Sequence, residues 1–385
     1  YSTTGLNGGT ISSVTYNYQG TGSTVYGPST TAPTNAGTYN IIPSNVVFAA
    51  GSSASNYSSI SYVNGSFTIN KKSATITADN KSVNYGDSAS YSVTLSGIGS
   101  FTAATLPGYS APTCTSSYTT TTSAMNGSNP NTLTITCSGA SSTNYSFNYT
   151  SGTLTVNKAT LTITPDAKSV TYGNAAPSYT FTVSGFKNSE TTSSAAGYSA
   201  PSCSSDYTTT TDVANSPRSI TCSGGAATNY SFASASANLT INKVTTLAIT
   251  ASNKSANFGD SITSLYNAST GYTTSGLATG VIGALTYTYA GVSPTVYASS
   301  TTAPTSPGTY TVTPSAVSFA SPGSGSTNNY ANITYTAGTL TINAANLVIT
   351  ANSPTAITYG DATPANGYST TGLNGGTISS VTYNY

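Results

Sequence analysis

The stretch TLTVNKATLTITPDAKSVTYGN, Thr153–Asn174, decides the fold. Leu154 and Val156 alternate with threonines before Lys158, and apolar residues alternate with threonines again after it. Alternation with a period of two among β-branched residues predicts strands with one buried and one exposed face. No Gly/Ser-rich spacer separates the two strands, so one strand passes directly into the next. We therefore expect a mainly β protein.

Four segments of this kind recur along the chain, beginning at Ser66, Thr153, Asn238 and Thr339. Each ends in an aromatic residue followed by glycine: Tyr85-Gly86, Tyr172-Gly173, Phe258-Gly259 and Tyr359-Gly360. An aspartate follows in three of them, Asp87, Asp260 and Asp361. The aromatic residues stand 87, 86 and 101 positions apart. Repetition at this interval is the signature of tandem modules.

A longer repeat contains these modules, because YSTTGLNGGTISSVTYNY occupies both residues 1–18 and residues 368–385. Tyr1 and Tyr368 stand 367 residues apart, a distance that four modules fill. We expect residues 1–71 to be the C-terminal part of a long β module and residues 345–385 the N-terminal part of the next one. Between them we expect two short Cys-containing modules, 72–158 and 159–243, and a long module, 244–344.

Several short strands in each module, separated by turn-forming residues, predict a small Ig-like sandwich or an open sheet with little helix. A short helical turn is expected only around residues 189–196. Modules that join without linkers should form an elongated rod with limited bending, because each module contacts its neighbours. Lysines crowd the junctions, where Lys81 could pair with Asp87 and Lys254 with Asp260.

The composition excludes several function classes. Charged residues make up 4% of the 385 residues, the net charge is +1, and His is absent. Triads, Cys-His dyads and most hydrolytic zinc sites require a His. Nine scattered Lys and Arg form no basic stripe, which argues against nucleic acid. No apolar stretch has the length of a membrane span. We expect no enzyme activity, no cofactor and no metal.

The four cysteines occupy matching places in the two short modules, Cys114 and Cys137 in one and Cys203 and Cys222 in the other. Matching placement favours the pairing 114–137 and 203–222 among three connectivities. Disulfides indicate an oxidising, extracellular compartment.

Two repeated features have alternative interpretations. The aspartates after the aromatic-glycine pairs could stabilise turns, or Asp87 with Asp79 could bind calcium, which prefers more carboxylates than are present. An Asn-Tyr pair recurs in each module, at Asn56-Tyr57, Asn144-Tyr145, Asn229-Tyr230 and Asn329-Tyr330. Burial in the core explains the recurring tyrosines better than an exposed row that stacks on sugars.

The run GTLTVNKATLTIT, followed by SVTYGN and then by a TITCSG…NYSF segment, resembles the YGX-type MBG domains, tandem modules of large bacterial surface proteins and adhesins. The resemblance covers about Ser73 to Lys243. It is looser in the long modules, where Phe258 replaces Tyr and Ala344 replaces the junction Lys. It implies a small β-grasp-like module with a spacer or adhesive role and no catalytic residues.

We therefore expect a non-enzymatic extracellular stalk or fibre of a giant bacterial surface adhesin or filament. Its partners would be adjacent modules and, through uncharged faces or edge strands, neighbouring rods. The alternative is an adhesive module that binds a glycan, another surface ligand or ice through Tyr- and Thr-rich faces such as TLTIT and YTTTT.

Overall fold

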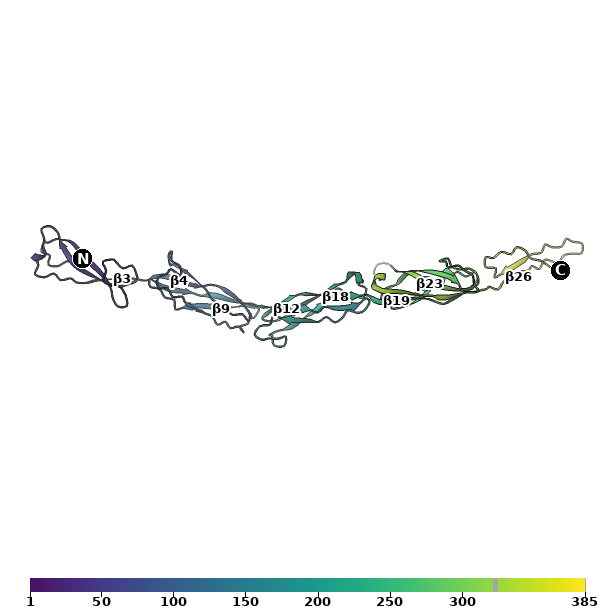
Figure 1. Ribbon diagram of the computed structural model, residues 1–385, viewed down its shortest axis with the longest axis horizontal. Helices are drawn as coiled ribbons and strands as arrows, with labels where there is room; N and C mark the ends of the chain where they lie inside the picture. The colour runs from purple at the N-terminus through teal and green to yellow at the C-terminus, as the bar shows by residue number, and fades with distance from the viewer. Residues whose placement is uncertain (321–324, 385) are drawn as a thin grey trace. The chain divides into compact units, whose positions relative to one another are not determined.

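A computed structural model of the chain describes residues 1–320 and 325–384; Tyr385, the last residue of the second 18-residue copy, lies outside them. Strands carry nearly all the regular structure in these residues (Figure 1). The helical elements described are single 3-10 turns: η1 (Ala54–Asn56), η2 (Val213–Asn215), η3 (Ile262–Ser264) and η4 (Thr327–Asn329). The prediction of a mainly β protein is confirmed. No helix among the described residues has the length and apolarity to cross a membrane.

The chain divides into two compact units. The first unit comprises Tyr1–Leu161, Ser184–Ala200 and Gly225–Ala233, and the second comprises Thr162–Val183, Pro201–Gly224 and Ser234–Tyr385. The division falls within residues 159–243. The module boundaries inferred from the sequence remain a prediction.

The first unit begins with a three-stranded antiparallel sheet of order β1-β2-β3, formed by β1 (Ile11–Gly20), β2 (Gly37–Phe48) and β3 (Gly65–Ile69). Strand β1 contains SVTYNY, which the alternation of apolar residues predicted as a strand. One face of the sheet carries stacked aromatic rings, with Tyr39 and Phe67 centred 5.2 Å apart. Tyr18 of β1 lies edge to face with Phe67 at 6.0 Å, so these rings link all three strands.

Residues 72–158 form two sheets, β10-β4-β6 and β5-β11-β9-β7, with β8 paired to β9. Their strands are β4 (Lys72–Ala78), β5 (Lys81–Asn84), β6 (Val93–Ser96), β7 (Thr113–Thr115), β8 (Met125–Asn126), β9 (Asn129–Ser138), β10 (Tyr145–Thr150) and β11 (Gly152–Asn157) (Figure 1). The apolar side chains Ile76, Ile135 and Leu154 are fully buried.

The last strands of this segment run parallel to its first strands. Strand β10 pairs in parallel with β4, and β11 pairs in parallel with β5. Parallel partners need a long connection, which the intervening strands supply. Because first and last strands point the same way, the chain enters at one end of the segment and leaves at the other. The next segment of the chain therefore begins at the opposite end from the one where this segment began.

Residues 159–243 repeat this strand order with β12 (Ala159–Pro165), β13 (Lys168–Thr171), β14 (Phe181–Ser184), β15 (Ser199–Ser204), β16 (Arg218–Ala226), β17 (Tyr230–Ser234) and β18 (Ser236–Asn242). Strand β18 pairs in parallel with β13 and antiparallel with β16. Strand β12 follows β11 after the single residue Lys158, as the sequence predicted. Around 189–196 there is no regular helix but a turn, in which the carbonyl of Thr191 accepts the N–H groups of Ser194 at 3.1 Å and of Ala195 at 2.9 Å.

Residues 244–344 form the sheets β21-β19-β24 and β20-β25-β23-β22. Their strands are β19 (Val244–Ala251), β20 (Lys254–Asn257), β21 (Tyr272–Ser275), β22 (Ile282–Gly291), β23 (Gly308–Phe319), β24 (Tyr330–Thr336) and β25 (Gly338–Asn343). Leu247 and Ile249 of one sheet share a buried cluster with Ile282 and Val317 of the other. Tyr287 and Tyr289 are both buried, on one face of β22, as the alternation in ALTYTY predicted.

The last regular structure is a two-stranded antiparallel hairpin of β26 (Val348–Ala351) and β27 (Tyr368–Thr371) (Figure 1). Its pairing repeats that of the long module, because Ala351 faces Tyr368 just as Ala251 faces Tyr272. The hairpin thus repeats the pairing of β19 with β21.

Candidate functional site: the junctions between modules

Each aromatic-glycine pair begins a tight turn, which in the first three cases follows a short strand, β5, β13 or β20. The glycines have positive φ angles: Gly86 +84°, Gly173 +87°, Gly259 +95° and Gly360 +98°. A residue with a Cβ atom adopts this region only at a cost, so the backbone requires glycine here. Asp260 and Asp361 accept the backbone N–H groups of Asn257 and Thr358 at 2.8 and 2.9 Å. These two aspartates therefore stabilise their own turns.

Asp87 occupies the same place in the first short module but binds across a junction. Its Oδ1 lies 2.8 Å from Nζ of Lys187, and this hydrogen bond lowers the pKa of the Asp87 carboxyl. The local pairing of Asp87 with Lys81 is therefore not formed, because a side chain 100 residues away takes its place. Both side chains are exposed, so solvent screens the pair and its main effect is to orient the two segments.

Glu190, the single glutamate of the sequence, joins two tyrosines at this junction. Its carboxylate accepts from the hydroxyls of Tyr85 at 2.8 Å and of Tyr230 at 2.5 Å. The two rings meet edge to face with centroids 5.5 Å apart. Burial, together with the Glu190 carboxylate, raises the pKa of Tyr230. Since both tyrosines are buried, this charge-assisted arrangement fixes the turn at Tyr85 against the loop that carries Glu190.

The second unit contains an equivalent junction built from different residues. Tyr172 is fully buried, and its hydroxyl accepts a hydrogen bond from Oγ1 of Thr279 at 2.8 Å. Its ring lies edge to face with that of Tyr330, with centroids 6.3 Å apart. Gly173 faces Ala278 so closely that an added Cβ atom would lie 2.5 Å from the alanine Cβ. Glycine is thus required here both by the turn and by the neighbouring segment.

A third junction, also in the second unit, joins Phe258-Gly259 to the loop after β27. Nδ2 of Asn374 donates to the carbonyl of Phe258 at 2.6 Å, and Gly259 faces the same side chain. Phenylalanine suits this position because the backbone, rather than a ring hydroxyl, makes the polar contact.

The asparagine of the Asn-Tyr pair makes a second contact at three junctions. Its Oδ1 accepts the backbone N–H of a residue in the preceding segment: Asn144 from Ala36 at 2.8 Å, Asn229 from Ala124 at 3.0 Å and Asn329 from Val213 at 2.9 Å. Asn229 and Asn329 are buried, so their amides replace water as the partners of these N–H groups. The sequence pattern therefore marks a contact between consecutive segments of the chain.

The tyrosine of the pair is buried in its own segment, at Tyr145, Tyr230 and Tyr330. Tyr145 donates to the carbonyl of Ile98 at 3.2 Å, whereas Tyr230 accepts from the N–H of Lys187 at 2.9 Å. Burial is therefore the environment of these recurring tyrosines, as the sequence predicted.

Two junction lysines contribute further hydrogen bonds. Nζ of Lys71 donates to the carbonyl of Ser142 at 2.7 Å, and Nζ of Lys158 donates to the carbonyl of Ala227 at 3.2 Å. Both carbonyls lie two residues before the asparagine of an Asn-Tyr pair. Each lysine thus ties the end of one segment to the loop that carries the asparagine of the next.

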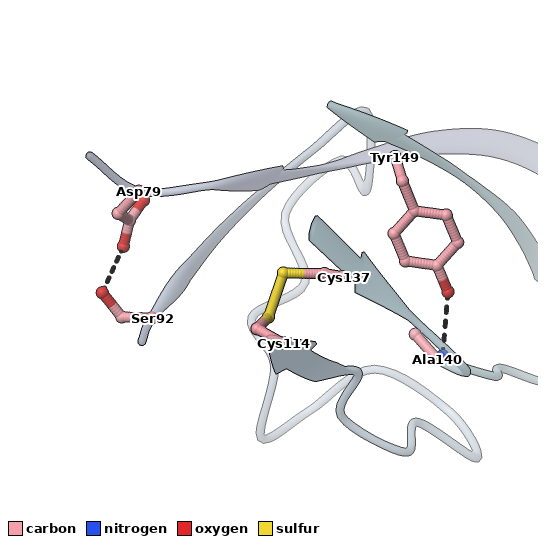
Figure 2. The surroundings of a disulfide bond; sticks show 6 residues. All are labelled: Asp79, Ser92, Cys114, Cys137, Ala140 and Tyr149. Atoms are coloured by element: carbon pink, nitrogen blue, oxygen red, sulfur yellow. Dashed lines mark hydrogen bonds between the residues drawn. A yellow bond between two sulfur atoms is a disulfide. The ribbon is translucent and has the colours of Figure 1, made fainter. Parts of the chain in front are cut away.

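The cysteines pair within each short module. Cys114 of β7 bonds to Cys137 of β9 (Figure 2), and Cys203 bonds to Cys222. In the same region Asp79 accepts hydrogen bonds from Ser92 at 2.6 Å, drawn in Figure 2, and from Thr94 at 2.7 Å, and these bonds lower its pKa. Its carboxylate therefore binds neighbouring hydroxyls. Among the described residues no three His, Cys, Asp or Glu side chains cluster as metal ligands would.

The YTTTT runs form turns. Thr122 accepts the N–H of Thr119 at 2.9 Å, and Tyr118 donates to the carbonyl of Asp87 at 2.7 Å. Tyr207 makes the corresponding contact with the carbonyl of Asn174 at 2.8 Å. These hydroxyls therefore brace the aromatic-glycine turns from inside each segment.

The sequence reasoning identified the aromatic-glycine turns but missed the loops that face them, including Lys187, Glu190 and Thr279. A signal for these loops exists in the repeated Ser/Thr-Gly-apolar triplet. It occurs at Thr4-Gly5-Leu6, Ser96-Gly97-Ile98, Ser184-Gly185-Phe186, Ser275-Gly276-Leu277 and Thr371-Gly372-Leu373. After three of these triplets, the next residue contacts a preceding aromatic-glycine turn: Lys187 at Gly86, Ala278 at Gly173 and Asn374 at Gly259. The contacting residue differs each time.

No curated protein matches the chain. Among solved structures, the N-terminal eight Ig domains of Down Syndrome Cell Adhesion Molecule isoform 1.30.30 match at 10% identity and a TM-score of 0.18, with 94% of this chain and 55% of that chain covered. The N-terminal four Ig domains of Dscam1 isoform 4.4 match at 9% identity and a TM-score of 0.15, covering 80% of each chain. The chain thus spans about half the length of the first of these structures.

The two short modules give a more specific comparison. The family model for the MBG domain of the YGX type matches residues 74–155 and residues 161–240. The matched ranges include both disulfides and the turns at Tyr85-Gly86 and Tyr172-Gly173. The chain carries two tandem MBG domains of the YGX type.

Proposed function

We propose that this chain is a non-enzymatic structural region, the stalk or fibre of a large bacterial surface protein. The observation that carries the proposal is the repeated junction, in which an aromatic-glycine turn and an asparagine amide both bind the adjoining segment. Two points of contact resist bending better than a flexible linker does. Junctions of this kind are best suited to a region that holds consecutive modules in line.

Two further features support an extracellular stalk. The two disulfides suit an oxidising compartment. The sequence holds no His and few charges, so it offers little acid-base chemistry and little dependence on salt. The YTTTT runs serve as turns, which removes one of the Thr-rich faces that a glycan- or ice-binding role would use.

Small-angle X-ray scattering of the full chain at low concentration tests the proposal. The wild-type chain should scatter as an elongated particle of limited flexibility. The variant Asn229→Ala/Asn329→Ala/Glu190→Gln should scatter as a more flexible chain, because three junction contacts are lost. Asn56→Ala is the matched control, since Asn56 belongs to the same repeated pair but is exposed. Equal flexibility in all three proteins, or wild-type binding on a glycan array, would count against a purely structural role.

A further inference from the structure

The first and last strands of the segment 72–158 form one continuous parallel pairing that passes through both of its sheets. Residues 72–84 contain β4 and β5, and residues 145–157 contain β10 and β11. Strand β4 pairs with β10 and β5 with β11, and in both pairs each partner stands 73 positions further along the chain. The two stretches therefore keep a single register while they cross together from one sheet to the other.

Side-chain and backbone hydrogen bonds complete this pairing. The parallel ladder is interrupted between β4 and β5, and there Oδ1 of Asn80 accepts the N–H of Thr153 at 2.8 Å. Beyond the last pair of β5 and β11, the N–H of Tyr85 donates to the carbonyl of Asn157 at 2.8 Å. Hydrogen bonds thus join the two stretches from end to end.

The long module in the second unit repeats the arrangement. Strand β19 pairs in parallel with β24 and β20 with β25, with each partner 86 positions further along the chain. Oδ1 of Asn253 accepts the N–H of Thr339 at 2.8 Å at the interruption, and the N–H of Phe258 donates to the carbonyl of Asn343 at 2.8 Å at the end. Two modules of different length therefore share this feature.

Apolar side chains cover one face of the paired strands. Ile76, Leu154 and Val156 are fully buried in the first module, and Leu247 and Leu340 are fully buried in the long one. Water would replace a hydrogen bond that lengthens, and packing excludes water from this face. Hydrogen bonds beside a dry, low-dielectric core are also electrostatically stronger than those in water.

The direction of the paired strands determines how tension along the chain acts on a module. The chain enters at the start of residues 72–84 and leaves at the end of residues 145–157, at opposite ends of the parallel pairing. Tension therefore pulls the two stretches past each other and strains all the hydrogen bonds between them together. A hairpin pulled at its open ends instead loses its bonds one after another. Bonds that must break together raise the barrier to unfolding, which governs resistance to force.

We propose that the parallel pairing of first and last strands is a mechanical clamp, by which each of these modules resists unfolding under tension along the chain. The clamp is formed within a single module and does not rest on the junctions or on the stalk function. Scattering tests the flexibility of the junctions, whereas force on a single chain tests the clamp. Either proposal can therefore fail while the other holds.

Force spectroscopy of single full-length chains held by their two ends tests the clamp. Unfolding of residues 244–344 should occur in one step and release about 300 Å of chain. The two short modules should release less, because their disulfides keep 23 and 19 residues closed. Reduction should lengthen these two steps by about 80 and 70 Å and leave the long step unchanged. The released lengths thus identify the long module.

Two proline variants in β20 separate the clamp from a general effect of mutation. Strand β20 is the edge strand of its sheet. Its N–H groups alternate in direction, so that of Ala256 points towards β25, like that of Phe258, and that of Ser255 points away. Ala256→Pro should unfold at least about fivefold faster at a given force, because one hydrogen bond of the clamp is lost. Ser255→Pro should unfold like the wild type, because an edge strand tolerates proline on its outer side.

Asn253→Ala and Tyr310→Phe form a second pair, in which the backbone is unchanged. Each variant loses one hydrogen bond, but the Tyr310 hydroxyl bonds to the carbonyl of Ser306, outside the clamp. Both variants should be less stable in urea, and only Asn253→Ala should unfold faster under force. An unchanged released length shows that each variant module still folds.

Three results would overturn the proposal. They are equal rates under force for the two proline variants, equal acceleration by Asn253→Ala and Tyr310→Phe, and unfolding of the wild-type long module in a series of small steps.

Discussion

Tyrosine takes the core positions that phenylalanine or leucine would fill in most β proteins. The sequence has 30 Tyr and 9 Phe, and Tyr39, Tyr172, Tyr230 and Tyr310 are among its largest fully buried side chains. The ring packs in the interior while the hydroxyl reaches a loop at the edge. Tyr39 and Tyr310 show this at equivalent positions, donating to the carbonyls of Asn35 and Ser306 at 2.6 Å. A small, weakly charged module thus gains apolar area and a loop contact from one residue.

Tyr287 is a buried tyrosine whose hydroxyl has no hydrogen-bond partner among the described residues. Removal of an unpaired buried hydroxyl also removes its desolvation cost, so Tyr287→Phe should leave the free energy of unfolding unchanged or raise it by about 1 kcal/mol. Tyr310→Phe, which removes a hydrogen-bonded hydroxyl, should lower it by about 1 kcal/mol. Urea denaturation of both variants at pH 7 measures the difference. Equal losses in the two variants would contradict this assignment.

Burial raises the pKa of Tyr266 and of Tyr287 to about 12. In the unfolded chain a tyrosine loses its proton near pH 10, so between pH 10 and pH 12 the folded state holds more protons than the unfolded state. The free energy of unfolding should therefore be unaffected by these groups below pH 10, fall as pH rises towards 12, and level off above it. Denaturation of wild type and of Tyr266→Phe across this range measures the effect. An equally steep decline in the variant would show that other groups cause it.

At the scale of elements, the same turn has different surroundings in different places. Tyr172 is fully buried and Gly173 faces Ala278, whereas Tyr359 is fully exposed and Gly360 has no atom within 4 Å of an added Cβ. The turn geometry is nevertheless the same, with φ of +87° and +98° at the two glycines. The turn therefore forms through its own backbone and side chain. Contact with a neighbouring segment is not needed for its geometry.

The two glycines make a matched pair for mutation. Gly360→Ala should cost about 1–2 kcal/mol of local stability through its positive φ alone. Gly173→Ala should cost more, because the new methyl group also collides with Ala278. Amide NMR should show shifts around residues 278–279 in Gly173→Ala, and shifts confined to the turn in Gly360→Ala. Undisturbed resonances at 278–279 would indicate that Gly173 and Ala278 are not in close contact.

At the scale of the whole molecule, the disulfide bonds are unevenly distributed along the chain. Both disulfides lie within the two MBG domains, and residues 244–344 contain no Cys. The long module instead has an extensive buried core that includes Tyr266, Tyr287, Tyr289 and Tyr310. Different parts of the chain therefore depend on oxidation to different degrees.

Reduction of the chain should expose this difference. The disulfides close loops spanning 23 and 19 residues, and each contributes about 3 kcal/mol in the chain-entropy model. Hydrogen exchange of the reduced chain should therefore show faster exchange in β7 and β9 and unchanged exchange in β22 and β23. Faster exchange in all four strands would show that the stabilities of these regions are coupled.

The sequence by itself determined the strands, the turns and the disulfide pairing. Alternation around Lys158 predicted β11 and β12, and glycine at each turn followed from a backbone that excludes a Cβ atom. Tertiary structure alone decided the partners of Asp87 and Glu190, whose contacts join residues 100 and 105 positions apart. The physical reason is one of range. Periodicity and turn chemistry act over a few residues and are visible in a local pattern. A junction contact depends on which loop the packed sheets bring to which turn, and the equivalent tyrosines Tyr85 and Tyr172 therefore bond to different partners, Glu190 and Thr279.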